Sequence, residues 1–170
     1  MSRLTSNSAA IASLEVALGD PRQGLPEDVF LFLSRITPLI NVDLLIQDEL
    51  GRTLLTWRDD EFFGQGWHIP GAVIRYKQTA AECIAACARR ELGAEVSFDA
   101  TPVLVQETIG AQRTRGHFIS LLYRCRLESA PDERLRSGDP HPVAGAWRWH
   151  DVCPPDLLEV QAQYARFFAC

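Results

Sequence analysis

The sequence predicts a single α/β domain, a sandwich with a mixed β-sheet and one central helix. The 170 residues are 46% hydrophobic, which is enough for one real core and too short for two ordinary domains. Apolar strand candidates lie both before and after one well-delimited helix, and a further helix follows the last strand. No internal repeat, low-complexity tract or linker divides this pattern, so we expect one fold unit.

The N-terminal segment is expected to form a helical extension, residues 1–22, ahead of a domain that spans residues 23–170. Residues 7–19 have a weak helical pattern of Ala10, Leu14 and Leu18, which ends at a Gly-Asp-Pro turn. Such a helix could support a homodimer or cover an apolar patch, and the sequence does not decide between the two.

The first part of the domain is predicted to contain a short helix followed by a β-hairpin. Pro26 and two acidic residues open a helix over residues 26–35. Two apolar runs, residues 39–47 and 52–58, flank the turn DELG and have the pattern of hairpin strands. A short strand over residues 67–69 follows a polar, glycine-containing loop.

The central helix has the clearest boundaries in the chain. Thr79 and Glu82 match a capping box, and Gly93, directly after Leu92, suits a left-handed C-cap. The remaining expected elements are strands over residues 102–109 and 117–127, a loop over 129–145, the strand GAWRWHDV and a last helix over about 155–168.

The net charge and the cysteine content indicate which binding partners are excluded and in which cellular compartment the protein is expected. A formal net charge of −5 gives no broad attraction to nucleic acid or to an anionic membrane. Five cysteines without a C-x-x-C pair indicate reduced thiols, and Cys83 and Cys87 are interpreted as buried small hydrophobes. With no apolar run of about 18 residues, we expect a soluble cytoplasmic protein.

Three charged residues stand where chemistry is possible. Glu91 projects from the apolar stripe of the central helix, where a carboxylate needs a ligand cation or a structural partner such as Arg58 or Arg89. The alternative is a glutamate at the helix end that reaches solvent. Asp43 interrupts the most apolar strand, so it lies on an exposed face or at a ligand-binding mouth of the sheet. Arg58 precedes a glycine loop, where a guanidinium can donate two parallel hydrogen bonds to a diphosphate. The alternative is an ordinary surface arginine.

Two histidines are candidate proton acceptors, because histidine titrates near neutral pH. His141 lies in a predicted loop and is the better candidate, whereas His117 begins a strand and has a packing role as its alternative.

The segment GWHIPGAVIRYKQTAAECIAACARRELGAEV, residues 66–96, resembles the signature of the Nudix family. In that family a P-G-G loop precedes a helix written G-x5-E-x7-R-E-U-x-E-E-x-G-U, where U is aliphatic. Pro70-Gly71 and Glu91-Leu92-Gly93 set the register, and only the last glutamate and the last glycine remain. The helix is therefore identified as a degenerate Nudix box, with substitutions at Ala72, Gln78, Ala86, Cys87 and Arg90.

Residues 24–168 are similar to one branch of this family, the GDP-mannose mannosyl hydrolases, through segments such as TPLINVDLLI, LGRTLLTWR, GQGWHIPG and HFISLLYRCRL. The resemblance implies a Nudix-type α/β/α sandwich, a homodimer and a small-molecule nucleoside diphosphate substrate. It also implies that water attacks the anomeric carbon of a nucleoside diphosphate sugar, with Mg²⁺ or Mn²⁺ neutralising the leaving group.

Carried over residue by residue, the resemblance assigns roles to individual positions. It implies that the Gly71 carbonyl and the Glu91 carboxylate bind the metal, that Arg58 and Asp43 line the substrate site, and that His141 is the general base. Phe118 aligns with a tyrosine that contacts the leaving group. Val73 and Ala86 stand where the branch has arginines, and the residues that could supply replacement charge are Arg75, Arg90, Arg113 and Arg115.

Two other functions remain open at this level. The first is attack on phosphorus in another nucleoside diphosphate compound, with Glu107 or Asp139 completing a metal site. The second is a binding protein of the same fold that recognises a nucleotide or metabolite without turning it over, which the loss of box carboxylates would explain.

Overall fold

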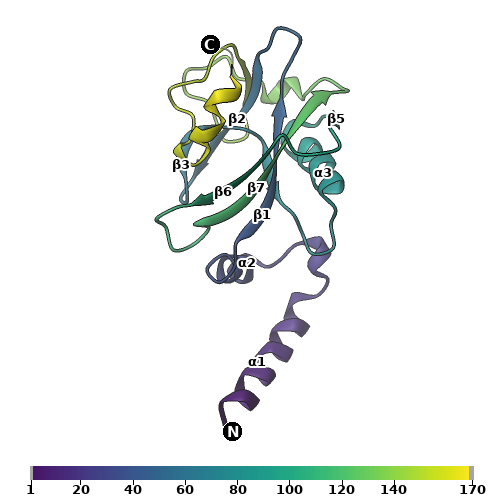
Figure 1. The fold of residues 1–170 in the computed structure, drawn as a ribbon, viewed down its shortest axis with the longest axis vertical. Coiled ribbons are helices and arrows are strands. Elements are labelled where there is room, and N and C mark those ends of the chain that lie inside the picture. The colour runs from purple at the N-terminus through teal and green to yellow at the C-terminus, as the bar shows by residue number, and fades with distance from the viewer. Residues whose placement is uncertain (1, 169–170) are drawn as a thin grey trace.

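The computed structural model describes residues 2–168 and has the predicted mixed α/β architecture. Helix α1 (Ser2–Leu18) projects from the body of the molecule, and a 3₁₀ turn η1 (Pro21–Gln23) and helix α2 (Glu27–Leu33) connect it to the sheet (Figure 1). Both helices differ in length from the expected spans. From residue 7 onward the side chains of α1 are almost all exposed, with Val16 at 85%, so α1 contributes little to the core.

The larger sheet has five strands in the order β4-β1-β7-β5, and β6 also pairs with β7. The long strand β7 (His117–Leu127) runs parallel to β1 (Leu39–Ile46) along one edge. Its other edge pairs with β5 (Val96–Phe98) and β6 (Leu104–Ile109), both antiparallel. The predicted mixed sheet is therefore confirmed.

The second sheet is antiparallel and has the order β3-β2-β8. Strand β2 (Thr53–Asp60) lies between β3 (Gly64–His68) and β8 (Trp147–His150). The predicted hairpin between the first two strands is wrong, because a single bridge, Gln47 to Thr53, joins them before they enter different sheets. Both edges of β1 are already paired, one with β7 and the other with β4 (Gly71–Val73).

The central helix α3 (Ala80–Leu92) is capped as the sequence predicts. The Thr79 hydroxyl accepts the Glu82 N–H at 3.2 Å, and the Glu82 carboxylate accepts the Thr79 N–H at 2.8 Å. Gly93 ends the helix with φ of 64°. The stripe that α3 presents to β1 and β4 includes Cys83 and Cys87, which are buried free thiols as expected.

Alternation along β1 divides the core into two clusters. Val42 and Leu44 face α3, whereas Asp43 and Leu45 point to the opposite face, where Tyr164 packs. Tyr164 belongs to η3 (Glu159–Phe167), a 3₁₀ segment that begins later than the predicted helix. The preceding residues are held extended by β3, because the Leu158 N–H donates to the Trp67 carbonyl. A short 3₁₀ turn η2 (Glu133–Leu135) interrupts the predicted loop.

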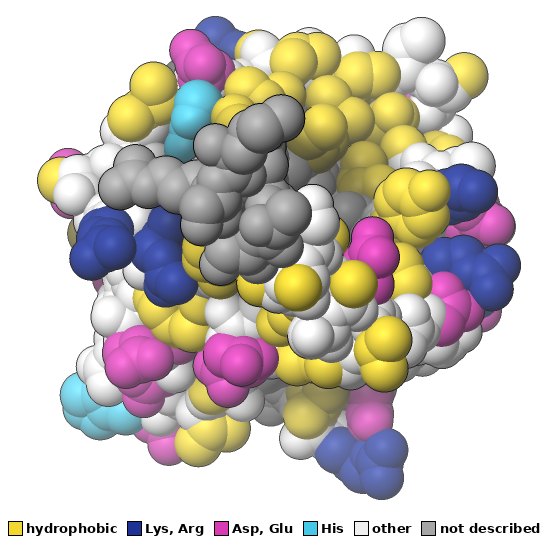
Figure 2. Space-filling view, turned by 90° about the horizontal axis from the view of Figure 1, so that it is seen from below, with side chains coloured by type: hydrophobic (Ala, Val, Ile, Leu, Met, Phe, Trp, Pro, Cys, Tyr) yellow, Lys and Arg dark blue, Asp and Glu magenta, His cyan; other side chains and the backbone are white. Residues whose placement is uncertain are grey.

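The end of the molecule from which α1 projects carries exposed hydrophobic side chains. Figure 2 shows hydrophobic side chains over a broad part of this face, with Lys, Arg, Asp and Glu side chains among them and around them. Phe32, Ile36 and Ile40, which lie in and after α2, are among the exposed large hydrophobic residues of the chain. Across residues 2–168, no helix combines the length and apolar character that a bilayer crossing requires.

Candidate functional site

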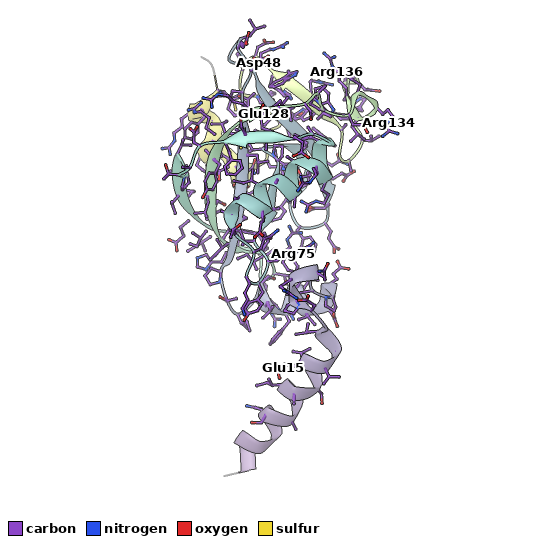
Figure 3. The ribbon with its side chains drawn as sticks, turned by 90° about the vertical axis from the view of Figure 1, so that its right-hand side faces the viewer. Glu15, Asp48, Arg75, Glu128, Arg134 and Arg136 are labelled. Carbon is purple, nitrogen blue, oxygen red and sulfur yellow. The ribbon has the colours of Figure 1, made fainter. Side chains whose placement is uncertain are left out.

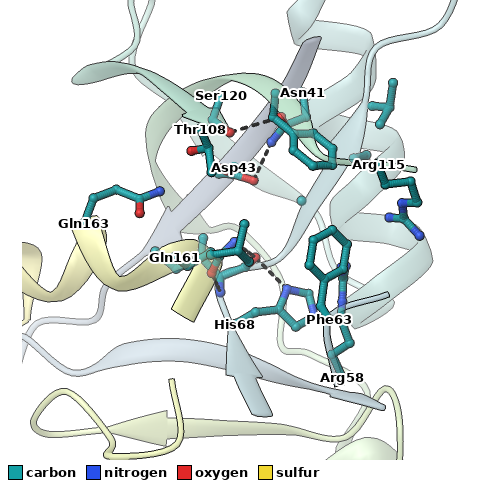
Figure 4. Close-up of a pocket in the computed structure, with 16 residues that line it drawn as sticks. Asn41, Asp43, Arg58, Phe63, His68, Thr108, Arg115, Ser120, Gln161 and Gln163 are labelled. Carbon is teal, nitrogen blue, oxygen red and sulfur yellow. Dashed lines mark hydrogen bonds between the residues drawn. The ribbon is translucent and has the colours of Figure 1, made fainter. Parts of the chain in front are cut away.

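Two adjoining cavities lie where β1, β2 and β4 meet. One of about 100 Å³ is lined mainly by polar side chains from β1, β6, β7 and η3 (Figure 4). The other, of about 550 Å³, extends beneath α2 and the C-terminal end of α3. Because the same five residues line both, they form one continuous cleft; the shared residues are Arg58, Gly71, Ala72, Val73 and Arg115.

Asp43 is the buried acid of the polar cavity, with 4% of its surface exposed. The Tyr164 hydroxyl donates to one carboxylate oxygen at 2.5 Å, and the Asn41 amide donates to the other at 2.9 Å. Ser120 in turn donates to the Asn41 carbonyl oxygen at 3.0 Å, which orients that amide. Burial raises the pKa of Asp43 to about 6, and these hydrogen bonds and Arg58 oppose the rise. Asp43 is thus poised to accept a proton near neutral pH.

Gly71 stands directly opposite Asp43 in the β1–β4 register. A Cβ atom at this position would collide with the Asp43 carboxylate and would lie 3.0 Å from the Val42 carbonyl oxygen. Only glycine therefore allows β4 to approach the acid so closely.

Replacing Gly71 by alanine is expected to lower the free energy of unfolding by about 1–3 kcal/mol, since the methyl group must displace β4 or Asp43. Chemical denaturation would measure this loss. The matched control is Gly138→Ala, where the added methyl meets nothing within 4 Å and the expected change is within about 0.5 kcal/mol. Equal stabilities for the two variants would contradict the close approach.

His68 lies in the same cavity but is held as a neutral ring. Its Nδ1 donates to the Ile69 carbonyl at 2.9 Å, so Nε2 accepts the Thr56 hydroxyl proton at 3.1 Å. Burial, assisted by the Arg58 charge, lowers its pKa to about 3. His68 is therefore a fixed, uncharged wall of the cavity.

Glu91 lies in the larger cavity with 19% of its side chain exposed. Its ion pair is with Arg90, at 3.0 Å, and not with Arg58 or Arg89 as spacing suggested, because Arg89 pairs with Glu95 at 3.1 Å. Burial raises the pKa of Glu91, and the charges of Arg90 and Arg58 oppose this. The carboxylate thus faces the cleft with cations near it.

The donor set suits a metal ion that comes with its substrate. Among residues 2–168 no group of three His, Cys, Asp or Glu side chains is placed to hold a metal. Magnesium, however, is commonly held by one or two carboxylates together with substrate phosphates. Glu91 and Gly71 line the same cavity, so the Glu91 carboxylate and the Gly71 backbone are the groups there that could hold such an ion.

The structure brings most of the predicted site residues together. Arg58 and Asp43 share the polar cavity with Phe118, and Gly71, Glu91 and Arg75 line the larger one. Arg58 lies inside β2, which runs two residues beyond the predicted strand end. Arg75 also donates to the Arg22 carbonyl at 3.4 Å, which ties the β4–α3 loop to η1, and it lies between the body and α1 (Figure 3).

His141 is not brought to this cleft. It lies in the loop before β8 and lines a separate cavity with residues from Arg134 to Ala146. Its backbone N–H donates to Asp139 Oδ1 at 2.9 Å. Of the four arginines considered as replacement charges, Arg113 is exposed and is not among the lining residues of the cleft.

Several site residues were missed by sequence reasoning. The polar cavity also includes Asn41, His68 and Ser120, whose only sequence signal is a polar residue within an apolar strand. Gln161 comes from η3, and its side chain bonds the Ile69 backbone at 2.7 Å. No local sequence pattern relates η3 to β3, so this contact could not be predicted from the sequence.

Comparison with known proteins identifies the family to which the domain belongs. Residues 37–169 match the model of the NUDIX domain. The low-salt glycan biosynthesis protein Agl8 of Haloferax volcanii is 30% identical over 79 residues, which is 46% of this chain and half of that protein's length.

Solved structures share the fold. A possible asymmetric diadenosine tetraphosphate hydrolase from Jonesia denitrificans superimposes with a TM-score of 0.60 at 19% identity, covering 78% of this chain and 92% of that one. The MutT NUDIX hydrolase of Burkholderia pseudomallei gives 0.61 at 20% identity, covering 78% and 99%. The domain match spans well over half of the chain, and the chain therefore belongs to the Nudix family of hydrolases.

Proposed function

We propose that this Nudix hydrolase cleaves a nucleoside diphosphate sugar, such as a GDP-mannose-like compound, in the presence of Mg²⁺ or Mn²⁺. Water attacks C1 of the sugar, and a nucleoside diphosphate leaves. The observation that carries the proposal is the division of one cleft into a polar end around Asp43 and a larger end lined by aromatic and aliphatic side chains, with arginines between them.

The polar end offers groups that match sugar hydroxyls. Asn41, Thr108, Ser120, Gln161 and Gln163 supply hydroxyl and amide groups that can donate and accept hydrogen bonds. The larger end includes Phe30 and Tyr76, on which a base can stack. A nucleoside diphosphate sugar has the same order of parts: hydroxylated ring, charged diphosphate, aromatic base.

Asp43 is the residue best placed to activate the water. It lies at the polar end, is largely ionised at neutral pH, and is oriented by Tyr164 and Asn41. In the proposed step the water oxygen bonds to C1 while the C1–O bond to phosphate breaks. Asp43 takes the water proton, and the diphosphate leaves as an anion beside Arg58. A bound magnesium ion, held by Glu91 and the Gly71 carbonyl, would neutralise that leaving group.

Attack on phosphorus is the competing chemistry. The name of the Jonesia denitrificans neighbour refers to a nucleoside polyphosphate, whereas the name of the Haloferax volcanii relative refers to glycan biosynthesis, which is consistent with a sugar substrate. The polar residues around Asp43 favour the sugar. We further propose a cytoplasmic homodimer, supported by the buried free thiols of Cys83, Cys87 and Cys125 and by the exposed hydrophobic face near α2.

A turnover screen in ¹⁸O-water tests both the substrate and the position of attack. The purified protein would be incubated with Mg²⁺ and a panel of nucleoside diphosphate sugars and nucleotides, and the products analysed by phosphorus NMR and mass spectrometry. Label in the free sugar supports carbon attack, and label in phosphate contradicts it. Ligand-induced thermal stabilisation without any product would instead indicate a binding protein.

In the same assay His141→Ala is expected to keep kcat/KM within about twofold of the wild type, because His141 lines a different cavity from Asp43. A loss of about a hundredfold or more would show that His141 acts as the base, as the family resemblance implies.

A further inference from the structure

Arg115 has a backbone conformation that only a few residues adopt without cost. It lies in the loop between β6 and β7 and has φ of 56°, in the left-handed region. Its N–H donates to the Ser34 hydroxyl at 3.1 Å, which fixes the loop against the end of α2. This conformation accompanies a side chain that enters the cleft and lines both of its cavities.

The guanidinium of Arg115 is surrounded by aromatic rings and lacks an anionic partner. It lies 4.9 Å from the ring centre of Phe62, 5.1 Å from that of Phe63 and 5.8 Å from that of Phe30. Its Nε is buried without a hydrogen bond, and no ion pair of Arg115 is found among residues 2–168. An unpaired buried donor on a partly buried cation is costly, which points to a missing anion.

A second guanidinium lies beside the same ring. Arg58 is 5.3 Å from the centre of Phe63, and Figure 4 shows Phe63 next to both arginines. Burial and the Arg58 charge both lower the pKa of Arg115. The charge of Asp60 opposes this shift, but Asp60 pairs with Arg58 at 3.6 Å and also accepts the backbone N–H groups of Phe62 and Phe63. Within residues 2–168, Arg58 and Arg115, at the junction of the cavities, thus have only Asp60 in common as a neighbouring anion, and its carboxylate already accepts other hydrogen bonds.

We infer that Arg115 and Arg58 together bind the diphosphate group of the substrate, with Arg115 donating from its buried Nε edge. This rests on the proposed function and names a binding residue for it. A diphosphate has the two adjacent anionic groups that such a pair requires, and guanidinium–phosphate contacts are charge-assisted and often bidentate. The ligand would pair both cations, and its sugar and base would extend into the two cavities on either side.

Binding of inorganic pyrophosphate, measured by calorimetry with and without Mg²⁺, tests this inference separately from turnover. Arg115→Met removes the donors but keeps an apolar stem among the rings, and it is expected to weaken pyrophosphate binding at least about tenfold. Arg115→Lys keeps the charge but lacks the fork, so it is expected to recover only part of the affinity. The matched control is Arg113→Met, which removes the same charge from an exposed site in the same loop and is expected to stay within about twofold.

The outcomes separate a binding role from a structural one. If Arg115→Met binds pyrophosphate as the wild type does, the inference is overturned, and a lowered melting temperature without ligand would then show that Arg115 only packs the rings. If pyrophosphate binding depends on Arg115 but no nucleoside diphosphate sugar is turned over, this inference stands and the proposed function fails. If Arg115→Met turns over a nucleoside diphosphate sugar with an unchanged KM, the proposed function stands and this inference fails.

Discussion

Asp43→Asn is expected to lower kcat/KM by about 10²–10⁴-fold, the range typical of losing a general base. Asparagine has nearly the same shape and can still accept one hydrogen bond, but it cannot take a proton from water. In the wild type, kcat/KM should fall as the pH drops through about 6, because protonation of Asp43 removes the base. The residual activity of the variant should lack this dependence. Steady-state kinetics from pH 5 to pH 8 measures both effects.

The same variant has a stability signature with a defined sign. The pKa of Asp43 is raised in the fold from its ordinary value of 3.8 to about 6, so the folded state binds the proton more tightly than the unfolded state. The contribution of Asp43 to stability is therefore greatest below pH 3.8 and is lost as pH rises through 6. Relative to the wild type, Asp43→Asn should gain about 2–3 kcal/mol between pH 4 and pH 7.

The matched control for Asp43 is Asp59→Asn in the neighbouring sheet. Asp59 is exposed and accepts a hydrogen bond from Gln65 at 3.1 Å, so neither activity nor the pH dependence of stability should change appreciably. An active Asp43→Asn enzyme with an unchanged pH profile would exclude Asp43 as the base and would leave it a structural role in the network with Tyr164.

The sequence predicted the elements of the fold better than their partners. The limits of α3 followed from local chemistry, since Thr79, Glu82 and Gly93 satisfy the helix ends by bonds within a few residues. The partner of β1 did not follow. The turn after β1 resembles a hairpin turn, but β1 pairs with β4 along one edge and with β7 along the other. Pairing between segments that are distant in the sequence leaves no local signal.

Prediction of the site had the same limit. Asp43 and Arg58 were found because a charge inside or at the end of an apolar strand is conspicuous. Arg115 was one of four arginines considered as replacement charges, and the sequence could not choose among them because Arg115 lies in an irregular loop. Tyr164 was not singled out, because it fits the apolar pattern of a terminal helix. His141 was favoured for its residue type and loop position, and loop position does not fix which cavity a side chain lines. Only the packing of η3 and the β6–β7 loop against the sheets defines the cleft.

Glu91→Gln tests whether the degenerate Nudix box of α3 still binds a metal ion. The one remaining box carboxylate lies at the end of α3 beside the Gly71 strand, and both line the larger cavity. If it holds a substrate-borne magnesium ion, its neutralisation should lower Mg²⁺-dependent kcat/KM by about 10²–10³-fold, since metal stabilisation of a leaving group is worth several kcal/mol. Calorimetry should also show that Mg²⁺ no longer strengthens pyrophosphate binding in the variant.

Stability distinguishes this role from a structural ion pair. Glu91 is mostly buried with a raised pKa, and its partner Arg90 is 56% exposed, so glutamine at this position should cost little free energy of unfolding. Glu95→Gln, which breaks the exposed pair with Arg89, is the matched control and should leave turnover and Mg²⁺ dependence unchanged. A Glu91→Gln enzyme with wild-type turnover and Mg²⁺ dependence would mean that the last box carboxylate serves only to pair Arg90. The diphosphate would then be neutralised by arginines alone.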